Sequence, residues 1–442
     1  MVFSSPSKAS AEINLDITLW DILVVWPLTS LHDFVYDSLG LESFKRSPLE
    51  VAIDLEEDTP DKLQKKISRI DNILNGQAKP GGRELSFALK RASKLSSEKV
   101  VRRFINAGAD VSNNTIRGSQ EDSKNSFTTL MEASNNPDPL VIKALLDAGA
   151  DYQVQYKSPV TPWQVETALT MAAGFGNVRG VKILLDHAAD KNDSCNRKCS
   201  APLISAIEGL HKKLTENIDK YHTDYRAKVF AREQALGPRY DAVVRLLLER
   251  GADVNGEDEN VDKTTPLLTS ILYKGSRFVP LLLEHGAKVD ISRHGFFPLG
   301  ASADMGELTV LKLLLQQGAN RFSVDNYGRN ALDDALRGRM APPIRMSMIE
   351  QLIDFGLTVS SQKGGKAVTL TDMWSALSNT QYFYTKSKED HMNAEAILVR
   401  LVNRGIALDD IDNQGRQLLV DARAYGYQLL VDSIEQRVRA VD

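Results

Sequence analysis

The stretch "VVRLLLERGADVNGED", residues 243–258, recurs in modified form along this 442-residue chain. Apolar residues three and four apart, such as Val244, Leu247 and Leu248, predict a helix with one apolar face. Gly251 follows, and glycine readily takes the left-handed backbone conformation that ends a helix. The pattern returns as "VVRRFINAGADVSNN" from 100, "VIKALLDAGADYQVQ" from 141, "GVKILLDHAADKND" from 180, "FVPLLLEHGAKVDIS" from 278, "VLKLLLQQGANRFSVD" from 310, "MIEQLIDFGLTVSS" from 348 and "ILVRLVNRGIALDDID" from 397.

A second pattern precedes these stretches. A threonine side chain can cap the start of a helix, and proline fits the first helical turn. The phrases therefore predict the first helix of each unit. They are "TTLMEA" at 128, "TALTMA" at 167, "TPLLTS" at 265 and "FPLGAS" at 297, with weaker versions at 47, 87, 201, 330, 371 and 417.

Helix, turn, helix and glycine stop, followed by an extended connection, resembles the ankyrin repeat, a unit of about 33 residues with a T-P-L-H-x-A phrase. The resemblance covers residues 47–442 in about ten degenerate units. It implies an all-α solenoid of stacked helix-turn-helix units, with hairpin or loop fingers between them. It also implies protein recognition through the finger tips and the inner helices, which form one long concave surface.

Two insertions interrupt the register. Residues 207–241 lie between the two helices of the fifth unit, and their apolar spacing predicts one helix that ends at Gly237-Pro238. This tyrosine-bearing helix either packs back on its neighbours or binds a partner. A smaller insertion, 378–395, lies in the ninth unit.

The two ends of the chain differ from the repeats between them. Residues 1–46 hold short apolar runs, and we expect a helical capping segment there, or alternatively a separate docking motif. Residues 414–442 resemble a terminal capping repeat, whose last helix turns its charged residues towards solvent: Glu435, Arg437 and Arg439.

Composition excludes several classes of protein. With 54 Lys and Arg against 58 Asp and Glu, the net charge is −4, which argues against nucleic-acid binding. No apolar run approaches the roughly 20 residues that span a bilayer, so we expect no membrane insertion. Two cysteines, Cys195 and Cys199, exclude a disulfide framework and favour a reducing, cytoplasmic location. We expect a monomer.

The sequence contains no recognisable catalytic or metal motif. Cys195 and Cys199 offer two ligands where a structural zinc takes four, and the seven histidines are scattered. No phosphate-binding loop, nucleotide fingerprint or nucleophile elbow is present. We therefore expect no cofactor, no metal and no enzymatic activity.

The finger tips are the expected binding positions, because side chains there take no part in packing. The tip candidates are Arg293, His294, Phe296, Asn326, Tyr327, Arg329, Gln414 and Arg416. Phe297, which stands where threonine is usual, is expected either at this surface or buried. Further candidates are Trp163, which alternatively packs beneath its own loop, and Tyr221 and Tyr225 in the 207–241 insertion.

These patterns favour a non-enzymatic scaffold or adaptor that binds a partner protein. One alternative is a secreted microbial effector that binds host factors, which would act in the host cytosol. Another is an enzyme with its active site in the insertions, although 207–241 and 378–395 contain no polar constellation.

Overall fold

We used a computed structural model of the chain. It describes residues 47–77, 79–112, 127–157, 165–187, 202–218, 223–256, 264–273, 276–292, 296–326, 328–337, 342–355, 388–403 and 416–439, together with residues 357, 370 and 374. The predicted segment 1–46, the first part of the 378–395 insertion and both cysteines lie outside these residues, whereas 388–395 belong to a helix.

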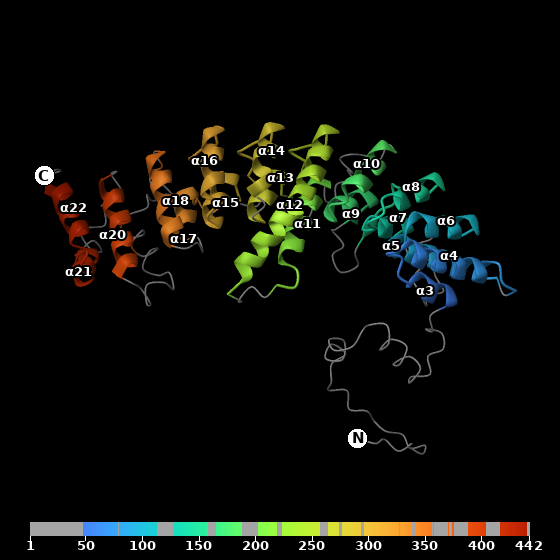
Figure 1. Ribbon diagram of the computed structural model, residues 1–442. Coiled ribbons are helices and arrows are strands. Elements are labelled where there is room, and N and C mark those ends of the chain that lie inside the picture. Colours follow the sequence, from blue (N-terminus) through green and yellow to red (C-terminus); the bar gives the residue numbers. More distant parts are fainter. Residues whose placement is uncertain are drawn as a thin grey trace, which may run out of the picture.

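Helix pairs stack in a curved row from one end of the described chain to the other (Figure 1). The first helices of the pairs pack on one another in one layer, and the second helices pack in another. The predicted all-α solenoid is therefore confirmed. The first helices are α3 (Pro48–Ile53), α5 (Gly82–Leu95), α7 (Thr129–Ala133), α9 (Ala168–Gly174), α11 (Pro202–Thr215), α13 (Pro266–Leu272), α15 (Pro298–Met305), α17 (Ala331–Arg337) and α21 (Arg416–Ala424).

The second helices are longer on average, and α6, α8, α12, α14 and α16 end at glycine stops. They are α4 (Pro60–Leu74), α6 (Glu98–Asn106), α8 (Leu140–Asp147), α10 (Val178–Asp186), α12 (Tyr225–Glu249), α14 (Val279–Glu284) after the 3-10 turn η2 (Ser276–Phe278), α16 (Leu308–Gln316), α18 (Pro342–Asp354), α20 (Lys388–Asn403) and α22 (Gln428–Arg439). In one finger, β1 (Tyr156–Lys157) pairs antiparallel with β2 (Val165–Glu166).

The start predicted at 87 lies inside α5, and α5 and α15 begin without a side-chain cap. Side-chain caps start five other first helices. In each case a side-chain oxygen accepts a hydrogen bond from the backbone N–H three residues later, which satisfies a donor that the helix leaves free. The capping residues and their donors are Ser47 with Glu50, Thr128 with Met131, Thr167 with Thr170, Thr265 with Leu268 and Asn330 with Asp333.

The glycine stops share one hydrogen-bonded turn. Gly251 has φ +79°, and the N–H of the following Ala252 donates to the carbonyl of Leu247, five residues back. This is the 6→1 bond of a Schellman motif, which uses carbonyls that the helix end leaves unpaired. The same pair of features occurs at Gly108, Gly149, Gly286 and Gly318, each followed by alanine.

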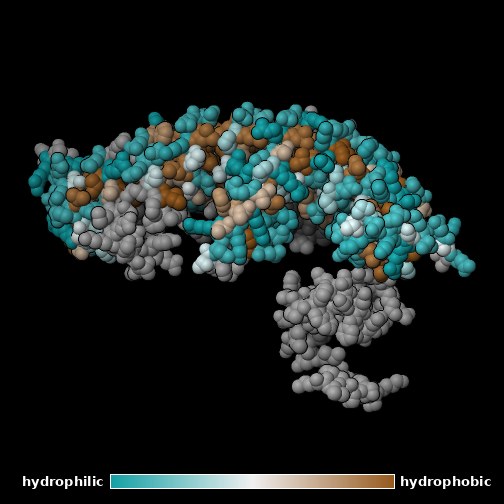
Figure 2. All heavy atoms as spheres, viewed as in Figure 1, coloured by the Kyte–Doolittle hydropathy of each residue, from teal (hydrophilic) through white to brown (hydrophobic). Residues whose placement is uncertain are grey.

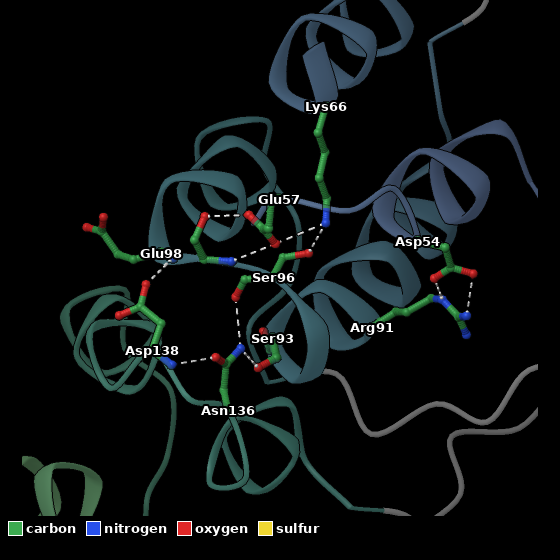
Figure 3. A network of polar contacts seen from close by, with 10 residues as sticks. Asp54, Glu57, Lys66, Arg91, Ser93, Ser96, Glu98, Asn136 and Asp138 are labelled. Carbon is green, nitrogen blue, oxygen red and sulfur yellow. Dashed lines mark hydrogen bonds and ion pairs between the residues drawn. The ribbon is translucent and has the colours of Figure 1, made fainter. Parts of the chain in front are cut away.

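Side chains of one unit hold the inter-helix turn of the unit before it. The Asn136 Nδ2 donates to the carbonyl oxygens of Ser93 and Ser96, each at 2.8 Å (Figure 3). Asn177 repeats this contact one unit later, with the carbonyls of Ser134 and Asn136 at 3.0 and 3.3 Å. These polar contacts fix the spacing of units at the end of the helices that lies opposite the glycine stops.

A buried ion pair joins the first two units in the same region. The Lys66 side chain is 1% exposed, and its Nζ lies 3.0 Å from Glu57 Oε1 and 2.8 Å from Ser96 Oγ (Figure 3). Glu57 also accepts hydrogen bonds from the N–H and the hydroxyl of Ser97, which precedes α6. A buried pair of charges is tolerated only when such further hydrogen bonds satisfy both groups.

The 207–241 insertion forms two antiparallel helices, which corrects the prediction of one helix ending at Gly237-Pro238. The first helix, α11, ends at Thr215, and its last carbonyls accept hydrogen bonds from Arg232 of α12. The second helix, α12, continues through Pro238 to Glu249. In Figure 1 this hairpin extends beyond the neighbouring helix pairs.

Arg277 of the next unit explains why the helix continues through this dipeptide. A β-carbon on Gly237 would lie 1.8 Å from Arg277 Nη1, so only glycine admits the guanidinium there. Arg277 binds both carboxylate oxygens of Asp241, at 2.8 and 2.6 Å, and contacts the Glu233 side chain at 3.4 Å. A proline inside a helix costs about 3 kcal/mol, and Arg277 favours the helical course by binding residues on both sides of Pro238.

The terminal helix differs in part from its predicted arrangement. Arg439 is exposed and pairs with Glu435 at 3.3 Å, as expected of a solvent-facing surface. Arg437, in contrast, lies half-buried and its Nη1 donates to the carbonyl of Val402 at 3.0 Å. It therefore holds the terminal helix to the preceding unit.

Candidate partner-binding surface

The finger at 319–330 shows how the chain presents side chains between units. Asp325 is 8% exposed, and its carboxylate accepts from the backbone N–H of Arg329 at 2.8 Å and from its Nε at 2.6 Å. Gly328 completes the turn with φ +73°. Asp325 and Gly328 thus form a tight turn, and it leaves Asn326 exposed.

Neighbouring fingers are joined by hydrogen bonds between a side chain of one finger and the backbone of the next. The N–H of Asn320 donates to Asp290 Oδ1 of the preceding finger at 2.8 Å. One unit earlier, Asn255 contacts the next finger twice, through the carbonyl of Gly286 and the N–H of Lys288. The fingers consequently form one connected edge rather than separate loops.

Large apolar side chains are exposed along this edge. Phe296 is 52% exposed, and in the next finger Phe322 and Val324 are 56% and 47% exposed. The guanidinium of Arg321 lies 4.9 Å from the centre of the Phe322 ring, and Arg321 Nη1 also donates to the carbonyl of Phe355 at 2.6 Å. Exposed aromatic and arginine side chains on a fixed frame are typical of binding hot spots.

The predicted tip residues differ in their exposure to solvent. Phe296 and Asn326 are exposed, whereas Arg329 is half-buried and its charge is paired with Asp325. Phe297 is 2% exposed, which confirms its burial. Arg293, His294, Tyr327 and Gln414 lie outside the described residues, and of Arg416, the first residue of α21, only the backbone is described.

The other candidates lie in the long connection 151–166 between α8 and α9 and in the 207–241 insertion. Tyr225 is half-buried at the start of α12, and Tyr221 and Trp163 lie outside the described residues. Tyr152 and Tyr156 of the long connection pack against the core, and the Tyr156 ring lies 4.3 Å from that of Phe127. Glu166 in β2 accepts a hydrogen bond from Thr170 at 2.9 Å, and burial raises the pKa of its carboxyl.

Sequence reasoning missed Phe322 and Val324. Both stand between a glycine stop and the turn residue Asp325, where no helical apolar stripe requires them. Their position could have revealed them, because apolar residues in a connection that fit the periodicity of neither flanking helix are not needed for its packing.

An acidic side chain is packed behind the same fingers. A β-carbon on Gly300 would lie 2.6 Å from Asp334 Oδ2, so α15 and α17 meet closely here. Burial raises the pKa of Asp334 to about 7. The nearby Arg329 lowers this pKa, whereas the neighbouring carboxylates raise it further. Within the described residues, no group of three or more His, Cys, Asp and Glu is arranged to hold a metal.

We expect Asp334→Asn to stabilise the protein at pH 8. Because the folded pKa lies above the unfolded value near 4, protonation favours the fold, and that stability is lost as the pH rises towards 7. A shift of about three units corresponds to a gain of at most about 4 kcal/mol, a figure that already includes the attraction between Asp334 and Arg329. Urea denaturation of both proteins from pH 5 to 8 measures this gain. A stability difference that does not change with pH would contradict it.

Comparisons with known proteins agree with the repeat architecture. A family model described as "Ankyrin repeats (3 copies)" matches residues 130–224 and 235–325. Ankyrin repeat protein nuc-2 of Neurospora crassa is 28% identical over 151 residues, which cover 33% of this chain and 14% of that protein. Zygote-specific protein 3 of Chlamydomonas reinhardtii is 34% identical over 94 residues, or 21% of this chain and 25% of that protein.

The chain thus matches a quarter or less of the length of these two relatives. Among solved structures, the crystal structure of the human ASB11 ankyrin repeat domain superposes with a TM-score of 0.44 at 23% identity. The match covers 61% of this chain and 96% of that one. In the described residues no helix is both long and apolar enough to cross a membrane.

Proposed function

Because this chain is an ankyrin repeat protein, and such repeats form protein–protein interaction modules, we propose that it acts as a non-enzymatic scaffold or adaptor. In this proposal a partner protein binds across the fingers and the inner helices. The host-targeting alternative would use the same surface for a host protein, so it differs in where the chain acts and not in how it binds.

The observation that carries the proposal is the exposed apolar group on two connected fingers, formed by Phe296, Phe322 and Val324. Transferring apolar surface out of water favours association by roughly 25 cal/mol per Å². The fingers are already held by hydrogen bonds within and between them, so binding orders few additional residues. Arg321 adds a cation beside the Phe322 ring, which suits a partner with carboxylates or aromatic side chains.

We expect Phe322→Asp to weaken capture of the partner by at least about 1–2 kcal/mol while the melting temperature stays nearly unchanged. The measurement is affinity purification from source cells with quantitative mass spectrometry, followed by a binding curve with the purified partner. Leu429→Asp is the matched control, because Leu429 is 65% exposed on α22, far along the chain from this finger. Equal capture by wild type and Phe322→Asp would overturn the proposed surface.

A further inference from the structure

The N-terminal half of α12 has an exposed apolar face that no described part of the chain covers. Its central residue is Phe230, which is 62% exposed. Around it, residues three and four apart lie on one side of the helix and are all exposed: Ala227, Ala231, Gln234 and Ala235. Figure 2 shows a pale brown strip along this hairpin among hydrophilic surroundings.

The opposite face of α12 is fully occupied. Leu210 and Leu214 of α11 are buried, and Val229 and Leu236 of α12 pack against the same core. Tyr240 is 1% exposed and its hydroxyl donates to the carbonyl of Gly174 at 2.9 Å. The hairpin cannot turn its Phe230 face inward without losing this packing.

The base of the hairpin is anchored on both sides. Arg239 donates to the carbonyls of Phe175 and Gly176, at 2.6 and 2.5 Å, in the preceding unit. In the following unit, Arg277 binds Asp241 and Glu233. The Phe230 face is therefore held at a fixed position on the array, which lowers the entropic cost of binding there.

The exposed charged residues on α12 beside this face are basic. The exposed charged residues of 225–239 are Arg226, Lys228 and Arg239, whereas Glu233 is half-buried and paired with Arg277. Lys228 forms an exposed pair with Asp224 at 2.9 Å, a contact that is weak in water. Arg226 thus lies at one end of the apolar stripe, and Arg239, whose guanidinium is held by the carbonyls of Phe175 and Gly176, lies at the other.

We propose that the outer face of α12 binds an amphipathic helix of a partner protein whose apolar stripe is flanked by Asp or Glu. Alanines allow a close approach of two helices, and Phe230 inserts between apolar residues of the incoming helix. A second copy of this chain fits less well, because basic residues at both ends of the stripe would meet in either orientation. This surface is separate from the fingers, so it does not depend on the function proposed above.

The test is a selection on the full chain with a displayed library of helical peptides. Every peptide carries leucine at the a and d positions of each heptad, and its flanking e and g positions vary among Glu, Lys and Gln. We expect Glu to be enriched at those positions. The enriched peptide should bind the wild-type chain at least about tenfold more tightly than the Phe230→Asp variant, and more weakly as salt is raised.

Two further variants make the outcome decisive. Arg226→Glu should weaken the Glu-flanked peptide and improve the matching Lys-flanked one, whereas Phe322→Asp, an equally exposed finger position, should bind like wild type. No enrichment, enrichment of Lys, or equal binding by Phe230→Asp would overturn the proposal. It is also overturned if Phe230→Asp instead abolishes dimers in light scattering, or binding to phosphatidylserine vesicles, while the peptide does not bind.

Discussion

Replacing Gly209 by alanine is expected to cost at least about 3 kcal/mol of the free energy of unfolding. Gly209 lies in α11, where a β-carbon would stand 2.0 Å from the carbonyl oxygen of Gly174 in α9. The obstacle is backbone, so no side-chain rotation can relieve it, and the two helices would have to separate. Their contact is one of the most extensive between first helices, so separation would disturb the core on both sides.

Urea denaturation of the full chain measures this effect. Gly82→Ala is the matched control, because a β-carbon there has open space around it and alanine is the better helix former. The control should unfold at the same urea concentration as wild type, or slightly higher. If both variants unfold like wild type, α9 and α11 do not pack at the distance that the structure gives.

The repeat register could be predicted from the sequence because its signals are local. A capping side chain bonds to the N–H three residues away, as Thr128 does with Met131. A stop glycine such as Gly251 needs only its own backbone freedom and the carbonyl of Leu247. Each signal lies within about six residues of its effect, so the chain can be interpreted one unit at a time.

The insertion could not be predicted this way, because a distant residue determines its course. Gly237-Pro238 has the local chemistry of a helix end, yet Arg277, from the next unit, occupies the space beside Gly237. The close approach of Gly209 to Gly174 likewise joins two units and leaves no periodic trace. Contacts of this kind become visible only in three dimensions.

The candidate surface was predictable in position but not in its full composition. The turn at Asp325 and Gly328 exposes Asn326 to solvent, as expected for one of the predicted finger-tip residues. Arginine is a residue type typical of interface anchors, but the Arg329 guanidinium forms an ion pair with Asp325 within its own finger. Residue type alone cannot distinguish an arginine that builds a turn from one that meets a partner.

Leu247→Ala is expected to cost about 2–5 kcal/mol of the free energy of unfolding. Leu247 is fully buried in α12, and its carbonyl accepts the hydrogen bond that ends the helix. Alanine removes apolar contacts and leaves a cavity, while the backbone hydrogen bond can remain. Because α12 packs on α10 and α11 of the array, the damage should begin in the fifth unit and its neighbours.

Hydrogen exchange with mass spectrometry locates the loss. In a repeat array each unit contacts mainly the units beside it, so protection should fall most in units four to six and least at the two ends. Leu429→Ala is the control, since Leu429 is 65% exposed and its truncation should leave exchange nearly unchanged. An equal loss of protection from the first unit to the last would mean that the array unfolds as one cooperative block, and that nearest-neighbour coupling does not describe it.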